Sequence, residues 1–271
     1  MIRSNCHTHT RYCDGKNTAE EMVRAAIDNG FESLGFSGHS PMFFENDWAM
    51  SEENLGEYIR EIRSLKEKYA DQIDILCGIE LDSCHTGIRV EDFDFVIASV
   101  HQFICGEKVY YIDYTGEVLA TAVRELFDGS WNKMAQEYFR LVADHTLSGN
   151  YDIVGHFDLI TKFDEPTPFF DENSPRYRHA AERAMEKLVR AGKIFEVNTG
   201  AISRGYRVTP YPSVQWLNLL HEMGGKVTVS ADAHHTSGVT CAFDLAEKRV
   251  RDAGFQEIWI LKGKEFVPVS F

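Results

Sequence analysis

The sequence predicts an α/β fold in which a closed or wound parallel sheet is covered by helices on its outside. Three observations favour this class. Short β-rich runs alternate with longer amphipathic runs about seven times along the 271 residues. Several β-rich runs are apolar almost throughout, which is typical of strands buried on both faces. The length is ordinary for one α/β barrel and does not require a division into domains.

The predicted strands are spread along the whole chain. In order they cover residues 2–6, 33–37, 74–80, 94–100, 152–156, 193–198 and 226–231. A last run, "EIWIL" at 257–261, is expected to pack near them.

Start and stop signals predict helices between the strands. The first helix has Thr18 and Glu21 as a capping box and Gly30 as a stop. The third has Asn173 or Ser174 as its cap and Pro175 in its first turn. The predicted helices cover residues 18–30, 51–70, 173–192, 213–225 and 238–254.

The most irregular segment is residues 103–131. We interpret it as an insertion after the fourth strand, formed by a hairpin and a lid, and such loops often contact substrates. The sequence has no internal repeat and no low-complexity linker. We therefore predict a single domain over residues 1–271.

Composition restricts the class of partner. The net charge of −14 argues against general nucleic-acid binding, although local cations can still hold a small phosphorylated substrate. No apolar run approaches the roughly 18 residues of a membrane span. No apolar signal segment follows Ile2, so we expect a cytoplasmic protein that binds no membrane. The six cysteines contain no C-x-x-C pair and are expected to be free thiols; the oligomeric state is left open.

Histidines and acidic residues follow the predicted strands. His7 and His9 are an i, i+2 pair, a spacing that places both side chains on one face of a strand. The C-terminal ends of parallel barrel strands lie on one rim, where active sites are built. The residues expected to converge there are His7, His9, Asp14, His39, Glu80, His101, His156, Asp232 and His234.

This set favours a metal centre. Mixed imidazole and carboxylate groups without an organised thiolate set suit Zn, Mn or Fe. Nine residues are too many for one tetrahedral ion and suit two or three divalent ions, which often serve phosphoryl hydrolysis. Taken singly, His39, Glu80 or His156 is compatible with an ordinary structural role. The remaining histidines are assigned structural or surface roles.

The sequence resembles the PHP (polymerase and histidinol phosphatase) family, in its histidinol-phosphatase branch. The resemblance runs from Cys6 to His235 and rests on the segments "CHTHTRYCDG", "GFSGHSP", "GIELD", "ASVHQF", "VGHFDLI", "EVNTGAISRGYRVTPYPS" and "SADAHH". It implies a distorted (β/α)7 TIM-like barrel with a trinuclear centre. The three implied ligand sets are His7, His9, Glu80 and Asp232; Glu80, His101 and His156, with Glu80 bridging; and Asp14, His39 and His234.

The resemblance implies a metal-dependent phosphomonoesterase of histidine biosynthesis. It would hydrolyse L-histidinol phosphate to L-histidinol and phosphate by attack of a metal-bridging hydroxide. Glu80, Asp232 and His234 are the expected catalytic residues. The expected phosphate contacts are Arg204, Arg207 and Lys162. Family members often carry arginine near the position of Lys162, and lysine is a point charge rather than a bidentate fork.

Three other functions remain open. The same centre could act on another small phosphate ester, such as a nucleotide or a nucleotide-derived phosphodiester. A metal-dependent amidohydrolase also begins with H-x-H, but Glu80 and the "DAH" at 232–234 fit the PHP pattern better. A non-catalytic PHP module would be expected to lack ligands, and none is missing here.

Overall fold

The computed structural model describes residues 2–165, 168–263 and 265–270. Within them, seven strands form one sheet in the order β1-β2-β3-β4-β7-β8-β9, and every neighbouring pair is parallel. The prediction of a parallel α/β sheet is confirmed. The strands are β1 (Ser4–Asn5), β2 (Ser33–Phe36), β3 (Asp74–Asp82), β4 (Phe95–Ser99), β7 (Ile153–Val154), β8 (Ile194–Asn198) and β9 (Lys226–Ser230).

The sheet is nearly closed into a barrel. Just beyond β1 and β9, the backbone N–H of His9 donates to the carbonyl oxygen of Ala233 at 2.9 Å. The N–H of Ala233 donates in turn to the carbonyl oxygen of His7 at 3.1 Å. The two edge strands therefore meet through the segments that carry the predicted ligands. The distorted barrel that the family resemblance implies is confirmed.

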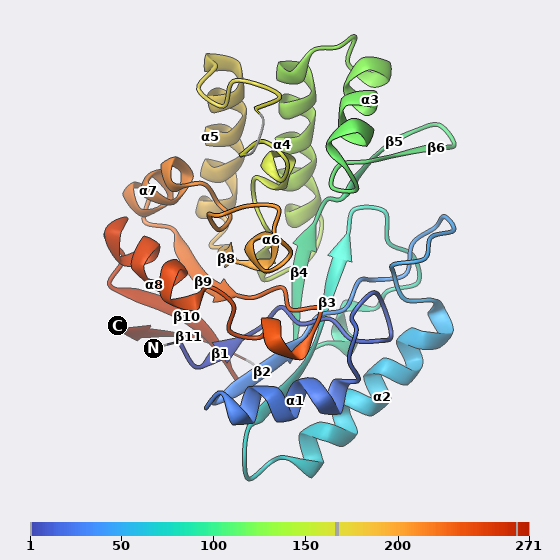
Figure 1. The fold of residues 1–271 in the computed structure, drawn as a ribbon, viewed down its shortest axis with the longest axis vertical. Helices are drawn as coiled ribbons and strands as arrows, with labels where there is room; N and C mark the ends of the chain where they lie inside the picture. The colour runs from blue at the N-terminus through green and yellow to red at the C-terminus, as the bar shows by residue number, and fades with distance from the viewer. Residues whose placement is uncertain (1, 166–167, 264, 271) are drawn as a thin grey trace.

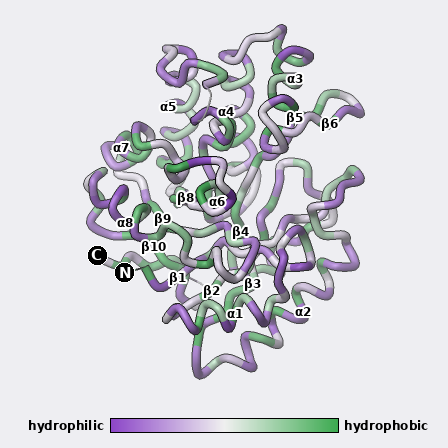
Figure 2. Tube along the Cα trace, in the orientation of Figure 1, coloured by the Kyte–Doolittle hydropathy of each residue, from purple (hydrophilic) through white to green (hydrophobic). Residues whose placement is uncertain are grey.

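Helices surround the sheet (Figure 1). Thr18 and Glu21 form the predicted capping box, and Pro175 follows the cap Ser174. Hydrophobic and hydrophilic residues alternate along α1 and α2 (Figure 2), whose apolar residues are buried against the barrel. The helices are α1 (Ala19–Asp28), α2 (Glu52–Lys68), α3 (Gly116–Leu126), α4 (Trp131–Leu147), α5 (Pro175–Arg190), α6 (Gly200–Ser203), α7 (Val214–Glu222) and α8 (Phe243–Asp252), with short 3₁₀ turns at Val90–Asp92, Leu159–Thr161 and Thr236–Gly238.

Four helices depart from the sequence prediction, which contained none of α3, α4 and α6 and began α8 too early. Helix α4 was not predicted; it packs beside α5 (Figure 1) and buries Tyr138 and Phe139. Helix α8 begins at Phe243 instead of near Gly238. Its delay has a backbone cause, because Ala242 adopts a left-handed φ of 55° and so cannot continue a right-handed helix.

Two antiparallel hairpins complete the fold. β5 (Gln102–Cys105) pairs with β6 (Lys108–Tyr111) and leads to α3, so the hairpin predicted in 103–131 is confirmed. β10 (Glu257–Lys262) pairs with β11 (Glu265–Ser270), which was not predicted. Leu261 packs with Cys6, Phe95 and Ile153 at the end of the barrel opposite the ligand-bearing rim. None of the described helices has the length and apolarity needed to cross a membrane.

Candidate metal centre

The nine predicted ligands converge on one rim of the barrel. His7 and His9 follow β1, His39 follows β2, and Glu80 lies in β3. His101, His156, Asp232 and His234 follow later strands, and Asp14 lies in the loop beyond β1. Among the described residues, ligand atoms of eight of the nine form three groups, and within each group the atoms lie within 4.8 Å of one another. The groups are His9, Asp14, His39 and His234; His7, His9 and Asp232; and His39, Glu80 and His101.

Glu80 lies at the middle of this arrangement and is fully buried. Its Oε2 is 2.8 Å from His39 Nδ1 and 3.3 Å from His7 Nε2. Its Oε1 is 3.1 Å from His156 Nε2 and 3.4 Å from His101 Nε2. The two carboxylate oxygens therefore face different histidines, the geometry that a carboxylate shared between two ions requires.

The implied ligand sets and the observed groups overlap. His7, His9 and Asp232 form one group, which contains three of the four residues of the first implied set but not Glu80. His156 lies next to His101, with its Nε2 at 3.2 Å from His101 Nε2, as expected if both histidines bind the same ion with Glu80. His9 and His39 each belong to two groups, which is a finer detail than the resemblance gave.

Several buried atoms of the cluster lie close to one another but form no hydrogen bond of good geometry among the described residues. They are His7 Nε2, His9 Nε2, Asp14 Oδ1, His39 Nδ1 and Glu80 Oε2. A buried polar atom without a partner costs about 1–3 kcal/mol, so a protein rarely keeps five of them together. Divalent cations would satisfy these nitrogen and oxygen lone pairs, and the donor set fits Zn, Mn or Fe.

The charges of the cluster also suit cations. Burial would raise the pKa of Glu80, but His39, His7 and His101 hold that pKa well below its usual value. Burial and the neighbouring His234 and His39 lower the pKa of His9 to about 3, so His9 is a neutral imidazole with a free lone pair. Glu80 as a carboxylate and His9 as a neutral imidazole are in the protonation states that metal binding requires.

Asp232 is held in an uncommon backbone conformation. Its φ is 46°, in the left-handed region that few non-glycine residues adopt. Gly200 lies against its carboxylate, and a Cβ built on Gly200 would be 2.5 Å from Asp232 Oδ2. Glycine is therefore required for the close approach of α6 to Asp232, and the local strain is of the kind that clusters at functional sites.

Two of the three predicted phosphate contacts lie at the centre. Arg204 Nη2 is 3.0 Å from Asp232 Oδ2, and its Nη1 is 3.0 Å from His234 Nδ1. Lys162 is buried, and its Nζ is 2.8 Å from the carbonyl oxygen and 3.1 Å from Oδ2 of Asp113. Both side chains line a cavity of about 150 Å³ together with Glu80.

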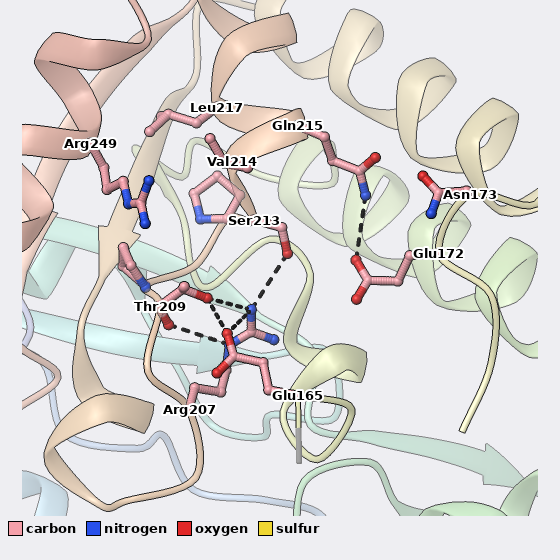
Figure 3. Close-up of a pocket in the computed structure, with 12 residues that line it drawn as sticks. Glu165, Glu172, Asn173, Arg207, Thr209, Ser213, Val214, Gln215, Leu217 and Arg249 are labelled. Atoms are coloured by element: carbon pink, nitrogen blue, oxygen red, sulfur yellow. Dashed lines mark hydrogen bonds and ion pairs between the residues drawn. The ribbon is translucent and has the colours of Figure 1, made fainter. Parts of the chain in front are cut away.

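The structure does not bring Arg207 to the centre. Its guanidinium lines a separate pocket, where it lies 3.2 Å from Glu165 Oε1 and contacts Thr209 and Ser213 (Figure 3). The turn at Gly205, with φ of 76°, reverses the chain between Arg204 and Arg207. The prediction that both arginines of this loop face the phosphate is therefore corrected for Arg207.

Beyond the expectation that the segment 103–131 contacts substrate, no role was predicted from the sequence for the residues around the mouth of the centre. A second cavity of about 270 Å³ shares Asp14, His39, His101, Asp113 and Tyr206 with the first. Its remaining lining is formed by Asp47, Trp48, Tyr111 and Tyr114. No motif marks Trp48, and Tyr206 lies in the segment "EVNTGAISRGYRVTPYPS", where the sequence does not determine which way its side chain points.

A comparison of the sequence with models of protein families identifies the family of this chain. The model of the PHP domain matches residues 5–200, which is more than half of the chain and includes seven of the nine convergent residues. The chain belongs to the PHP family. The two remaining members of the cluster, Asp232 and His234, lie beyond the matched segment but in the same barrel.

Relatives of this PHP chain cover nearly all of it. A probable histidinol-phosphatase of Deinococcus radiodurans is 30% identical, and the match covers 92% of each chain. A probable histidinol-phosphatase of Schizosaccharomyces pombe is 28% identical over 96% of this chain and 89% of the relative. Among solved structures, the histidinol phosphate phosphatase of Lactococcus lactis, complexed with zinc, L-histidinol and phosphate, superposes with a TM-score of 0.73 at 24% identity, covering 98% of each chain.

Proposed function

We propose that this PHP protein is a metal-dependent phosphomonoesterase that hydrolyses L-histidinol phosphate to L-histidinol and phosphate, a step of histidine biosynthesis. One observation carries the proposal. The cavity of about 150 Å³ is lined both by Glu80 and His156 and by two fixed cations, Arg204 and Lys162. A phosphoryl group needs that combination of metal ligands and cations, because an acidic protein of net charge −14 otherwise repels it. The names of the relatives support the same activity.

The nine convergent residues are the proposed ligands of two or three divalent ions. Such ions supply positive charge to the phosphoryl oxygens and lower the pKa of water that they bind. Arg204 contributes a planar guanidinium, whose fork matches the geometry of phosphate oxygens. Lys162 contributes a point charge that Asp113 holds in place. We assign the catalytic roles to Glu80, Asp232 and His234, which all line this cavity.

The mouth of the centre supports histidinol phosphate over a nucleotide. The cavity of about 270 Å³ is lined by Trp48, Tyr111, Tyr114 and Tyr206, and by the carboxylates of Asp47 and Asp113. Aromatic rings stack on an imidazole, and rings and carboxylates together attract an ammonium group. The additional phosphates of a nucleoside diphosphate or triphosphate would instead be repelled by Asp47 and Asp113.

A panel of phosphate esters tests this function. Histidinol phosphate, nucleoside monophosphates, a dinucleotide phosphodiester and phosphoethanolamine are compared by kcat/KM on enzyme of measured metal content. We expect histidinol phosphate to give the highest kcat/KM and chelator-treated enzyme to be inactive. A higher kcat/KM for a nucleotide or a phosphodiester would replace the proposed substrate while keeping the metal centre.

A further inference from the structure

Glu196 is a fully buried carboxylate in the middle of β8, between Phe195 and Val197. Its Oε1 lies 2.5 Å from His7 Nδ1 and also accepts from the hydroxyl of Ser230. Its Oε2 accepts from the backbone N–H of His156 at 2.9 Å and from Asn198 Nδ2 at 2.9 Å. Four donors from four neighbouring parts of the rim therefore meet on one carboxylate.

Asp82 has a similar role two residues beyond Glu80, on the same face of β3. Its Oδ2 is 2.9 Å from His101 Nδ1 and accepts from the N–H of His101 at 3.2 Å. Its Oδ1 accepts from the N–H of Cys84 at 2.8 Å and from the amide of Gln102. Asp82 is also buried.

The histidines that these two carboxylates hold lie on opposite sides of Glu80. His7 Nε2 is 3.3 Å from Oε2 of Glu80, and His101 Nε2 is 3.4 Å from Oε1. A neutral imidazole has one N–H and one lone pair, on different nitrogens. When Nδ1–H donates to an outer carboxylate, the lone pair of Nε2 must point inward toward Glu80.

The free-energy cost of burying two carboxylates indicates that Glu196 and Asp82 have a functional role. An ionised carboxylate in the barrel interior is expensive unless hydrogen bonds satisfy both oxygens. An apolar residue at position 196 would match its neighbours in β8 and avoid that cost. Outer carboxylates of this kind fix the orientation of metal-binding histidines, and removing one typically lowers metal affinity roughly 10- to 100-fold.

We propose that Glu196 and Asp82 are positioning residues that fix His7 and His101 with a proton on Nδ1 and direct both Nε2 lone pairs to the two sides of Glu80. The inference rests on the proposed metal centre. It goes beyond the nine ligands, because neither carboxylate belongs to the ligand groups among the described residues.

Amide substitutions test the proposal with little change of shape. In Glu196→Gln, an NH₂ group replaces one of two oxygens that each accept two hydrogen bonds. It must then face either His7 and Ser230 or His156 and Asn198, all of which donate. Asp82→Asn creates the same conflict beside His101. Asp152→Asn is the matched control, since Asp152 is a half-buried carboxylate that accepts from Val96 N–H at 2.8 Å and contacts no histidine.

Zinc alone is the probe, and two readouts are needed. Competition with a chromophoric chelator gives the zinc dissociation constants, and we expect them to rise about 10- to 100-fold in Glu196→Gln and Asp82→Asn but to stay unchanged in Asp152→Asn. NMR of the ¹⁵N-histidine-labelled, zinc-loaded protein identifies the bound nitrogen. We expect Nδ1–H signals for His7 and His101 in the wild-type protein.

The possible outcomes distinguish failure of the proposed function from failure of the positioning role of Glu196 and Asp82. A wild-type protein that binds neither zinc nor, in the same competition assay, manganese or iron contradicts the proposed function. A wild-type protein that binds zinc through Nδ1 of His7 and His101 overturns the positioning role, even when Glu196→Gln does not fold. Wild-type zinc affinity in folded Glu196→Gln and Asp82→Asn overturns it as well, and leaves both carboxylates a structural role only.

Discussion

Arg204 is bound to Asp232 at the rim of the barrel, with Arg204 Nη2 at 3.0 Å from Asp232 Oδ2 and Nη1 at 3.2 Å from the Asp232 carbonyl oxygen. Burial would raise the pKa of Asp232, but Arg204 and His7 hold that pKa well below its usual value. The guanidinium is thus fixed beside a proposed ligand, with part of its surface lining the cavity. A cation that is oriented before the substrate binds is well suited to stabilise a phosphoryl transition state.

Arg204→Ala should therefore lower kcat/KM by a factor that corresponds to about 2–4 kcal/mol, the usual effect of removing a charged group that binds the transition state in an enclosed site. At saturating metal concentration the metal content should stay unchanged, because arginine supplies no ligand atom. Kinetics with histidinol phosphate and metal analysis of the same preparations measure both effects.

Arg207→Ala is the matched control for this prediction. It removes the same charge from the same loop, but Arg207 is buried among Thr161, Thr209 and Glu165. We expect a lower melting temperature and a kcat/KM close to that of the wild type. Wild-type kcat/KM in both variants would mean that the metals and Lys162 hold the phosphate without Arg204.

Glu80→Gln should nearly abolish turnover and reduce the bound metal. The reason is that the two oxygens of Glu80 face His39 and His7 on one side and His156 and His101 on the other. An amide nitrogen cannot replace either oxygen as a ligand. Circular dichroism should show a folded protein, and the Asp152→Asn variant should keep both metal and activity. Full metal content with normal turnover in Glu80→Gln would exclude a shared carboxylate.

The sequence predicts the rim well because the physical constraints on it are local. Strands buried on both faces must be apolar, so their ends are visible, and parallel strands bring those ends together. His39 and His156 could therefore be placed in one cluster although they lie far apart in the chain. Helix α4 was missed because the segment before it was assigned to one long insertion, and its burial depends on packing against α5.

The direction of loop side chains was not accessible from the sequence. Arg204 and Arg207 are three residues apart, yet they line different cavities, and the turn with positive φ at Gly205 lies between them. Glu196 had a readable signal, since a carboxylate stands in an otherwise apolar strand, "KIFEVN". Its partners, His7 and Ser230, come from distant parts of the chain, so the signal could not be assigned to a role.

Tyr111→Ala should impair recognition of the alcohol part of the substrate. Tyr111 lies in β6 and lines the cavity at the mouth of the centre, where an imidazole can stack on its ring. Removal of one stacking interaction costs about 1 kcal/mol, so kcat/KM for histidinol phosphate should fall roughly fivefold. The value for phosphoethanolamine, which has no ring, should change little.

Tyr110→Ala provides the control for Tyr111. The two residues are neighbours in β6 and so point to opposite faces, and the Tyr110 hydroxyl donates to Glu125 at 2.7 Å. Kinetics of Tyr110→Ala should match those of the wild type. An equal loss for both esters in Tyr111→Ala would show that Tyr111 supports the hairpin and does not select the substrate.

Glu172 should make the stability of the protein depend on pH near neutrality. It lies in the pocket of Arg207, where Gln215 Nε2 is 3.4 Å from its Oε2 (Figure 3). Burial, together with Asp158 and Asp164, raises the pKa of Glu172 from 4.5 to about 7. Between these two values the folded protein holds a proton that the unfolded chain has released. The free energy of unfolding must therefore fall as the pH rises through this window.

Glu172→Gln should remove this contribution, because a neutral amide needs no proton. Urea unfolding at pH 5, 6, 7 and 8 measures the difference in unfolding free energy between variant and wild type, in which pH effects common to both cancel. We expect that difference to shift in favour of the variant from pH 5 to pH 8. Glu67→Gln, on the exposed face of α2, should show a constant difference over the same range. A constant difference for Glu172→Gln too would mean that Glu172 is ionised in the folded protein throughout this range.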